Sequence, residues 1–146
     1  MQIHYLDIEL MEKICHRLAV AVFNTNEDPI SPFQDHTISL LDSALNLPKA
    51  TFDNQELYST LVDKAAILYY ALNKNHPFRN GNKRIATASL LVFLHINDYW
   101  LDAGKNEMVE KALYVAKSTS IQQNEIINNL KTWIDDHLIS QSVKNH

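Results

Sequence analysis

Apolar residues recur every three or four positions along most of the chain, a spacing that is typical of amphipathic helices. Asp7 can cap the first helix, whose apolar face we expect to contain Ile8, Met11, Ile14, Cys15, Leu18 and Val22. Residues 24–36 carry two prolines and are expected to form a loop. A short helix follows, ends at Pro48, and has apolar positions at Ile38, Leu41 and Leu45. The next helix is marked by Leu57, Leu61, Ala65, Leu68 and Leu72.

The segment from about Asn82 to Ile96 is apolar nearly all round, which predicts a helix in the centre of a bundle. Two further helices are expected over 107–117 and 122–138, and Ser120 with Gln123 resembles a capping box for the second. Extended backbone is expected over 47–53 and 99–103, and the polar tail after Ser140 is expected to fray. We therefore predict an all-α fold, a compact helical bundle with a short extended flap, as one domain over residues 1–146.

The composition is that of a soluble globular domain, with 46% hydrophobic residues, 21% charged residues and a net charge of −4 over 146 residues. This slight acidity gives no general attraction to nucleic acid or to an anionic membrane, and we expect neither as a partner. Cys15 is the single cysteine, so an internal disulfide is impossible. The longest apolar run, Ile85 to Ile96, is too short to span a bilayer. With no basic stretch and apolar run at its start, the chain is expected to be cytoplasmic.

Candidate chemistry concentrates in residues 76–84, the sequence His-Pro-Phe-Arg-Asn-Gly-Asn-Lys-Arg, directly before the most apolar helix. The first turn of a helix leaves backbone N–H groups unpaired and carries partial positive charge. Gly81 lets an anion approach the main chain, and Lys83 and Arg84 add full positive charge. These features predict an anion cradle at the start of the helix. The spacing is not that of a Walker loop.

His76 lies just before this cradle, and an ordinary imidazole, with a pKa of about 6.5, accepts protons near neutral pH. A base beside a bound phosphate is what attack by a hydroxyl on phosphorus requires. Phe78 is expected to anchor the segment in the core, and the carbonyl oxygen of Asn80 could face Mg²⁺. Each feature alone has an ordinary explanation: a loop histidine, a solvated Lys-Arg pair, an Asn-Gly turn. Their coincidence at one helix start favours a phosphate site.

The segment resembles the signature of the Fic/Doc family. The general Fic pattern is His-Pro-Phe-x-Asp/Glu-Gly-Asn-Gly-Arg-x-x-Arg, whereas the Doc branch reads close to His-x-Phe-x-Asp/Asn-Ala/Gly-Asn-Lys-Arg. Lys83 fits the Doc branch, and Thr87 stands where Fic enzymes carry a second arginine. Residues 40–45, followed by Leu47 and Pro48, are similar to the family segment that leads into a flap that clamps the substrate.

The resemblance implies a role for each matching residue. His76 would be the catalytic base, and Asn80 would occupy the magnesium position. Gly81 and Asn82 would line the anion hole, while Lys83 and Arg84 would hold the nucleotide phosphates, with Arg84 also counted as catalytic. The flap, which would align an extended target segment by β-augmentation, would consist of Leu47, Pro48, Lys49, Ala50 and Thr51.

The resemblance further implies a toxin that uses ATP and Mg²⁺ to transfer the γ-phosphate to a protein hydroxyl, such as a threonine of elongation factor Tu, and so halts translation. A Phd-like antitoxin would be its partner, because the sequence contains no inhibitory-helix motif of the family. Two alternatives stay open. One is a Fic-type transferase that moves AMP from ATP to a protein hydroxyl. The other is a catalytically inert binding module, which the neutral Asn80 in place of a carboxylate would suit.

Overall fold

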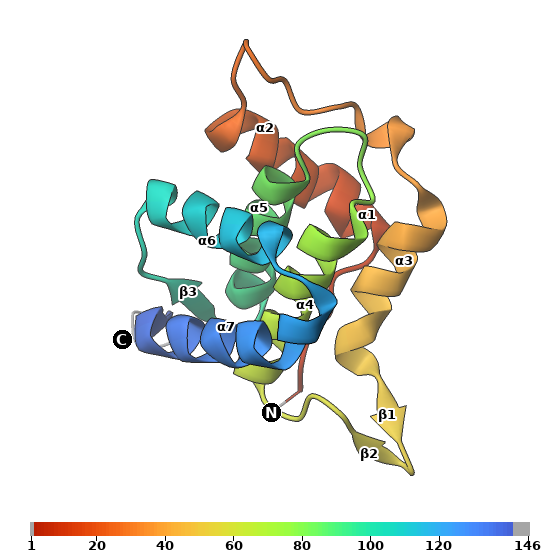
Figure 1. Cartoon of the computed structure of the whole chain (residues 1–146), viewed down its shortest axis with the longest axis vertical. Helices are drawn as coiled ribbons and strands as arrows, with labels where there is room; N and C mark the ends of the chain where they lie inside the picture. Colours follow the sequence, from red (N-terminus) through yellow and green to blue (C-terminus); the bar gives the residue numbers. More distant parts are fainter. Residues whose placement is uncertain (1, 142–146) are drawn as a thin grey trace.

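The computed structural model describes residues 2–141, and these form a mostly helical fold, so the prediction of an all-α protein is confirmed (Figure 1). The prediction that the tail after Ser140 frays falls on residues 142–146, which lie outside the described residues, except for Gln141, whose N–H donates to Asp98 O at 2.9 Å. The longer helices are α2 (Arg17–Phe23), α3 (Ile38–Asn46), α4 (Leu61–Asn75), α5 (Asn82–Ile96), α6 (Lys105–Lys117) and α7 (Gln123–His137). No helix within residues 2–141 is both long enough and apolar enough to cross a bilayer.

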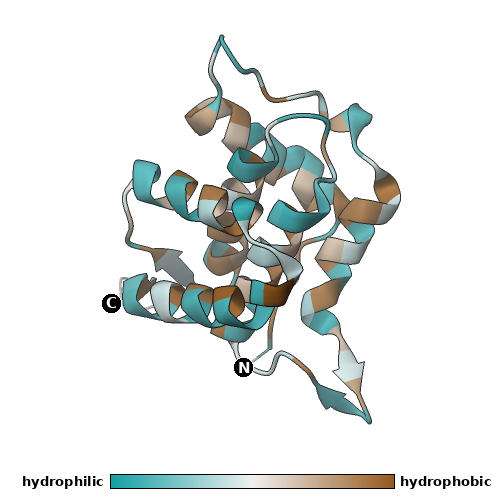
Figure 2. Cartoon of the chain, in the orientation of Figure 1, coloured by the Kyte–Doolittle hydropathy of each residue, from teal (hydrophilic) through white to brown (hydrophobic). Residues whose placement is uncertain are grey.

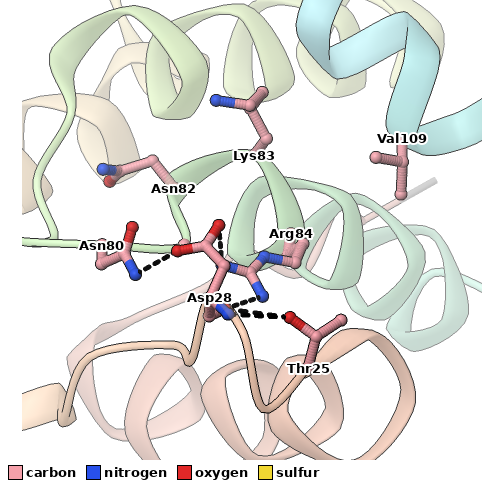
Figure 3. A pocket seen from close by; sticks show the side chains of 8 residues that line it. Thr25, Asp28, Asn80, Asn82, Lys83, Arg84 and Val109 are labelled. Carbon is pink, nitrogen blue, oxygen red and sulfur yellow. Dashed lines mark hydrogen bonds and ion pairs between the residues drawn. The ribbon is translucent and has the colours of Figure 1, made fainter.

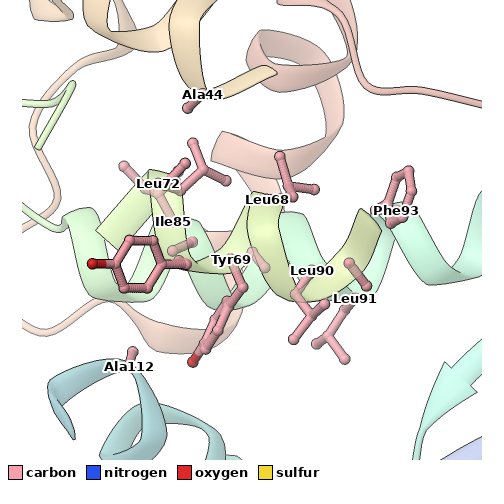
Figure 4. Packing of buried hydrophobic residues seen from close by; sticks show 14 of the residues in the cluster. Ala44, Leu68, Tyr69, Leu72, Ile85, Leu90, Leu91, Phe93 and Ala112 are labelled. Carbon is pink, nitrogen blue, oxygen red and sulfur yellow. The ribbon is translucent and has the colours of Figure 1, made fainter. Parts of the chain in front are cut away.

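Helix α5 occupies the centre of the bundle, as its all-round apolar sequence predicts. Every residue from Ile85 to Leu94 is buried, and α5 packs against α4, α6 and the first helix. Figure 4 shows Leu68 and Leu72 of α4 beside Ile85 and Leu90 of α5. Hydrophilic residues predominate on the turns of α6 and α7 that face the viewer in Figure 2. The core thus fixes the position of the segment that enters α5.

The first helix runs through α1 (Ile8–Leu10), a π-helical stretch (Met11–His16) and α2, and its predicted apolar face is partly wrong. Ile14 and Val22 are 47% and 40% exposed. The buried positions instead follow a strict four-residue spacing: Met11, Cys15, Ala19 and Phe23. A four-residue spacing overshoots the 3.6-residue turn of an α-helix. The wider π-helical turn absorbs that overshoot and keeps these residues on one face.

Two helix starts differ from the predictions. Helix α4 begins at Leu61, after a capping box in which Asp63 N donates to Thr60 Oγ1 at 3.0 Å and Thr60 N donates to Asp63 Oδ2 at 3.4 Å. Leu57 lies outside this helix and is exposed. The capping box before α7 uses Thr119 and Gln122, one residue earlier than predicted, and includes a 3-10 turn at Ser120–Gln122.

The predicted extended segment over 47–53 is only partly extended. Leu47–Lys49 form a 3-10 turn with Pro48 buried, so the prediction is wrong there. Strands β1 (Thr51–Phe52) and β2 (Gln55–Glu56) form an antiparallel hairpin. Its turn residues Asp53 and Asn54 have φ values of 53° and 63°, as a two-residue hairpin turn requires.

A second small sheet closes the other side of the molecule. Strand β3 (Tyr99–Leu101), within the predicted extended link, pairs antiparallel with β4 (Leu138–Ser140). The last helix therefore ends at His137 because Leu138 already belongs to a strand. The sequence pattern alone gave no indication of β4.

Candidate active site at the start of α5

The segment before α5 turns sharply where α4 ends. His76 caps α4 in the left-handed conformation, with φ 49° and ψ 56°. Phe78 is buried, as predicted, and its ring centroid lies 5.8 Å from that of Phe33 and 6.0 Å from that of His36. Thr37 N donates to Pro77 O at 2.8 Å, which ties the segment to the start of α3. The loop is therefore anchored at its centre while His76 stays exposed.

Gly81 is required by both backbone and packing. Its φ is 88°, in the left-handed region where residues with a Cβ are disfavoured. A Cβ added there would lie 2.9 Å from Ile30 Cγ1. Ile85 N donates to Gly81 O at 2.9 Å, the first bond of α5. The loop over 24–31 thus packs directly beneath the start of the central helix.

Asn82 holds the loop together from within the helix. Its Oδ1 accepts from Phe78 N and its Nδ2 donates to Phe78 O, both at 2.8 Å. The family resemblance implies that Asn82 lines an anion hole through backbone and side chain. In the structure the whole amide is bonded to Phe78, so this side chain shapes the cradle by fixing the loop.

A cavity of about 280 Å³ opens at the start of α5 (Figure 3). Its walls come from the motif, from the loop after α2 and from α6. The lining residues are Thr25, Asp28, Asn80, Gly81, Asn82, Lys83, Arg84 and Val109. The structure therefore brings together five of the predicted site residues, those from Asn80 to Arg84.

Arg84 points across this cavity to Asp28 (Figure 3). Arg84 Nη1 donates to Asp28 O at 2.6 Å, and Nη2 lies 3.2 Å from Asp28 Oδ2. Asn80 Nδ2 donates to Asp28 Oδ1 at 2.7 Å and to Pro29 O at 2.6 Å. Lys83 extends to the other side of α5 in the same view, away from Asp28.

His76 does not line this cavity. It belongs to a second hollow, of about 490 Å³, with Asp35, Thr37, Phe78 and Arg79. Arg79 Nη1 lies 4.0 Å from Asp35 Oδ2, and both side chains are exposed. One motif thus serves two hollows, a cationic cavity at its C-terminal end and a hollow with the imidazole at its N-terminal end.

A buried lysine connects the flap to the bundle. Lys64 of α4 is fully buried, and its Nζ donates to Glu56 Oε1 at 2.9 Å and to Pro48 O at 3.2 Å. Burial lowers the pKa of Lys64, but hydrogen bonds with Glu56 and Tyr5 outweigh it and the pKa is raised overall. Lys64 therefore remains charged and holds both ends of the segment over 48–56. Phe52, in that segment, is 75% exposed.

Sequence reasoning missed Asp28 and Thr25, which reach the site from the loop after α2. Asp28 N donates to Thr25 Oγ1 at 3.1 Å, a local turn that the pattern Thr-x-x-Asp-Pro can suggest. That pattern cannot place the turn beside Arg84, which follows 56 positions later in the chain.

A magnesium ion would find few ligands in the protein itself. Within residues 2–141 no group of three His, Cys, Asp or Glu side chains could hold a metal ion. The nitrogen of the Asn80 amide is committed to Asp28 and Pro29, which leaves its oxygen for a cation. An amide oxygen is a ligand type that Mg²⁺ accepts.

Comparison with known proteins agrees with the motif. The chain is 47% identical over 64 residues to the protein named Toxin Doc of Mycolicibacterium smegmatis, a match that covers 44% of this chain. The chain thus matches about half, 49%, of the length of that curated relative. No solved structure matches. Residues 5–94, which include the motif, the loop after α2 and the flap, match the Fic/DOC family. The chain therefore belongs to the Fic/DOC family.

Proposed function

We propose that this protein is a Doc-like toxin that transfers the γ-phosphate of ATP to a hydroxyl group of a protein, such as a threonine of elongation factor Tu. The observation that carries the proposal is the cavity at the start of α5, where Arg84 already binds an anion, the carboxylate of Asp28. A guanidinium that binds a carboxylate suits a phosphate equally well. The similarity to a protein named Toxin Doc points in the same direction.

The reaction assigns one role to each end of the motif. The target hydroxyl oxygen attacks the γ-phosphorus, its proton passes to the His76 imidazole, and the bond from that phosphorus to the bridging oxygen breaks to release ADP. Arg84, Lys83 and the free N–H groups of α5 would hold the phosphates. The nucleotide must then extend from the cavity at Arg84 toward the hollow at His76. Magnesium, facing the Asn80 oxygen, would offset phosphate charge.

The flap and the partner follow from the same proposal. The segment over 47–51 would align an extended stretch of the target, and the edge of the β1–β2 hairpin offers backbone groups for it. A Phd-like antitoxin would restrain the toxin. Binding experiments with the purified target and antitoxin test both proposals.

The decisive experiment supplies ATP labelled at either the α or the γ position to the protein in a translation extract. Protein label from the γ position alone supports the proposal. Label from the α position would instead show AMP transfer. Label from neither position, with the parent and His76→Ala equally inactive, would identify an inert binding module.

His76→Ala should abolish transfer and growth arrest, because it removes the imidazole that would accept the proton of the target hydroxyl. His76 is exposed and caps a helix, so the variant should still fold, as circular dichroism can check. His95→Ala is the matched control, since His95 is exposed and lies near the opposite end of α5. Growth arrest that survives His76→Ala would refute the role of His76, and His95→Ala should leave growth arrest unchanged.

A further inference from the structure

The cationic cavity is occupied by a carboxylate of the protein itself. Asp28 Oδ2 lies 3.2 Å from Arg84 Nη2, and Asp28 Oδ1 accepts from Asn80 Nδ2 at 2.7 Å (Figure 3). Each carboxylate oxygen thus meets a hydrogen-bond donor of the predicted site. Two oxygens held by these two donors are what a bound phosphate would present to the same groups.

We propose that Asp28 competes with the nucleotide phosphates for this cavity, so that ATP binds only when the Asp28 carboxylate moves away from Arg84. The inference rests on the proposed function, because it requires that the cavity bind a nucleotide polyphosphate. It extends the proposed site to Asp28, which lies outside the motif, and it implies that the loop after α2 regulates ATP binding.

The exposure of the two partners shows which one can move. The Arg84 side chain is 12% exposed, whereas that of Asp28 is 66% exposed. Residues 24–29 are all exposed. The loop is held at its ends, where Ile30 N donates to Asn24 Oδ1 at 2.7 Å and Asn80 N donates to Ser31 Oγ at 3.1 Å. Asp28 can therefore turn into water while Arg84 stays in place.

Asp28 is poorly placed to act as a ligand of magnesium instead. Both of its oxygens already accept hydrogen bonds from donors, and a carboxylate that stayed there would repel the phosphates that bring the ion. A metal ligand would strengthen binding only when Mg²⁺ is present, whereas a competitor weakens binding with or without it. The two roles predict opposite results.

Calorimetry with ATP tests the competition, with and without magnesium, on the parent and on Asp28→Asn. The variant keeps the shape of the side chain and removes its charge. We expect it to bind ATP about fivefold more tightly in both conditions, the factor that corresponds to a partly exposed ion pair. Glu27→Gln is the matched control, because it removes the same charge from the same exposed loop at a residue outside the cavity lining. The control should bind ATP as the parent does.

The outcomes separate this inference from the proposed function. Unchanged or weaker ATP binding by Asp28→Asn overturns the inference. If ATP binding is weaker only when magnesium is present, Asp28 is a ligand of the metal instead. An equal gain in Glu27→Gln also overturns it, because the effect would then be general electrostatics. Arg84→Ala reports on the function itself. If the parent binds ATP and Arg84→Ala binds it equally well, or if no variant binds ATP, the proposed nucleotide site fails and the inference fails with it.

Discussion

Gly81→Ala should destabilise the protein for two reasons, backbone strain and a steric clash with Ile30. A residue with a Cβ at a φ of 88° costs roughly 1.5 kcal/mol relative to glycine. The new Cβ would also lie 2.9 Å from Ile30 Cγ1 and 3.1 Å from Ile30 Cγ2, and relieving such overpacking costs about 1 kcal/mol more. We therefore expect a loss of about 2.5 kcal/mol in the free energy of unfolding.

Urea unfolding of a double-mutant cycle can measure the two parts separately. Ile30→Ala removes the two nearest carbons, Cγ1 and Cγ2, keeps the contact with Cβ at 3.2 Å, and leaves the backbone strain. In that background Gly81→Ala should cost only about 1.5 kcal/mol, a coupling of about 1 kcal/mol. The same loss in both backgrounds would refute the packing part, and a loss below about 0.5 kcal/mol in the parent would refute the backbone part.

The other glycine of the chain provides the control. Gly104 has φ −65°, and nothing lies within 4 Å of a Cβ added there. Gly104→Ala should change stability by less than about 1 kcal/mol, because a more restricted unfolded chain offsets a poorer helix cap. The contrast between the two glycines tests whether the start of α5 depends on Gly81 in particular.

Two further results are expected. Glu56→Gln should lower the free energy of unfolding, measured in urea, by about 2 kcal/mol, because it removes the charged partner of the buried Lys64 ammonium. The exposed ion pair of Glu9 with Lys13 provides the control, and Glu9→Gln should leave stability nearly unchanged. Burial raises the pKa of the Cys15 thiol to about 12. Since the unfolded thiol ionises near about pH 8.5, stability should fall between about pH 9 and 12 in the parent but fall less in Cys15→Ala, and equal pH profiles would contradict the burial effect.

The parts of the site that lie next to one another in the sequence could be predicted, and the parts that the fold brings together could not. Asn80 to Arg84 line one cavity because they are consecutive residues at a helix start. Asp28 reaches the same cavity only because Ile30 packs under Gly81 and Ser31 bonds with Asn80. Neither contact leaves a pattern in the sequence, so the position of the Asp28 carboxylate in this cavity could not be predicted.

The fold shows the same division. An uninterrupted apolar segment predicts the central α5, because a helix that is apolar on every side must be buried on every side. The buried face of the first helix could not be predicted from α-helical spacing, since a π-helical stretch shifts it away from Ile14 and Val22. The flap prediction placed extended backbone on Leu47–Lys49, where the proline instead favours a 3-10 turn.

Asp28→Asn should move stability and nucleotide affinity in opposite directions. Arg84 is largely removed from water, and in the free protein the Asp28 carboxylate balances its charge. The variant keeps the bond to the Asp28 backbone oxygen but should lose about 1 kcal/mol of stability. ATP, however, then meets no competing charge. Urea unfolding with and without saturating ATP measures both, because the stabilisation by a ligand grows with its affinity. If Asp28 were purely structural, Asp28→Asn would lower both stability and ATP affinity. If Asp28 competes with the phosphates, the substitution lowers stability but raises ATP affinity.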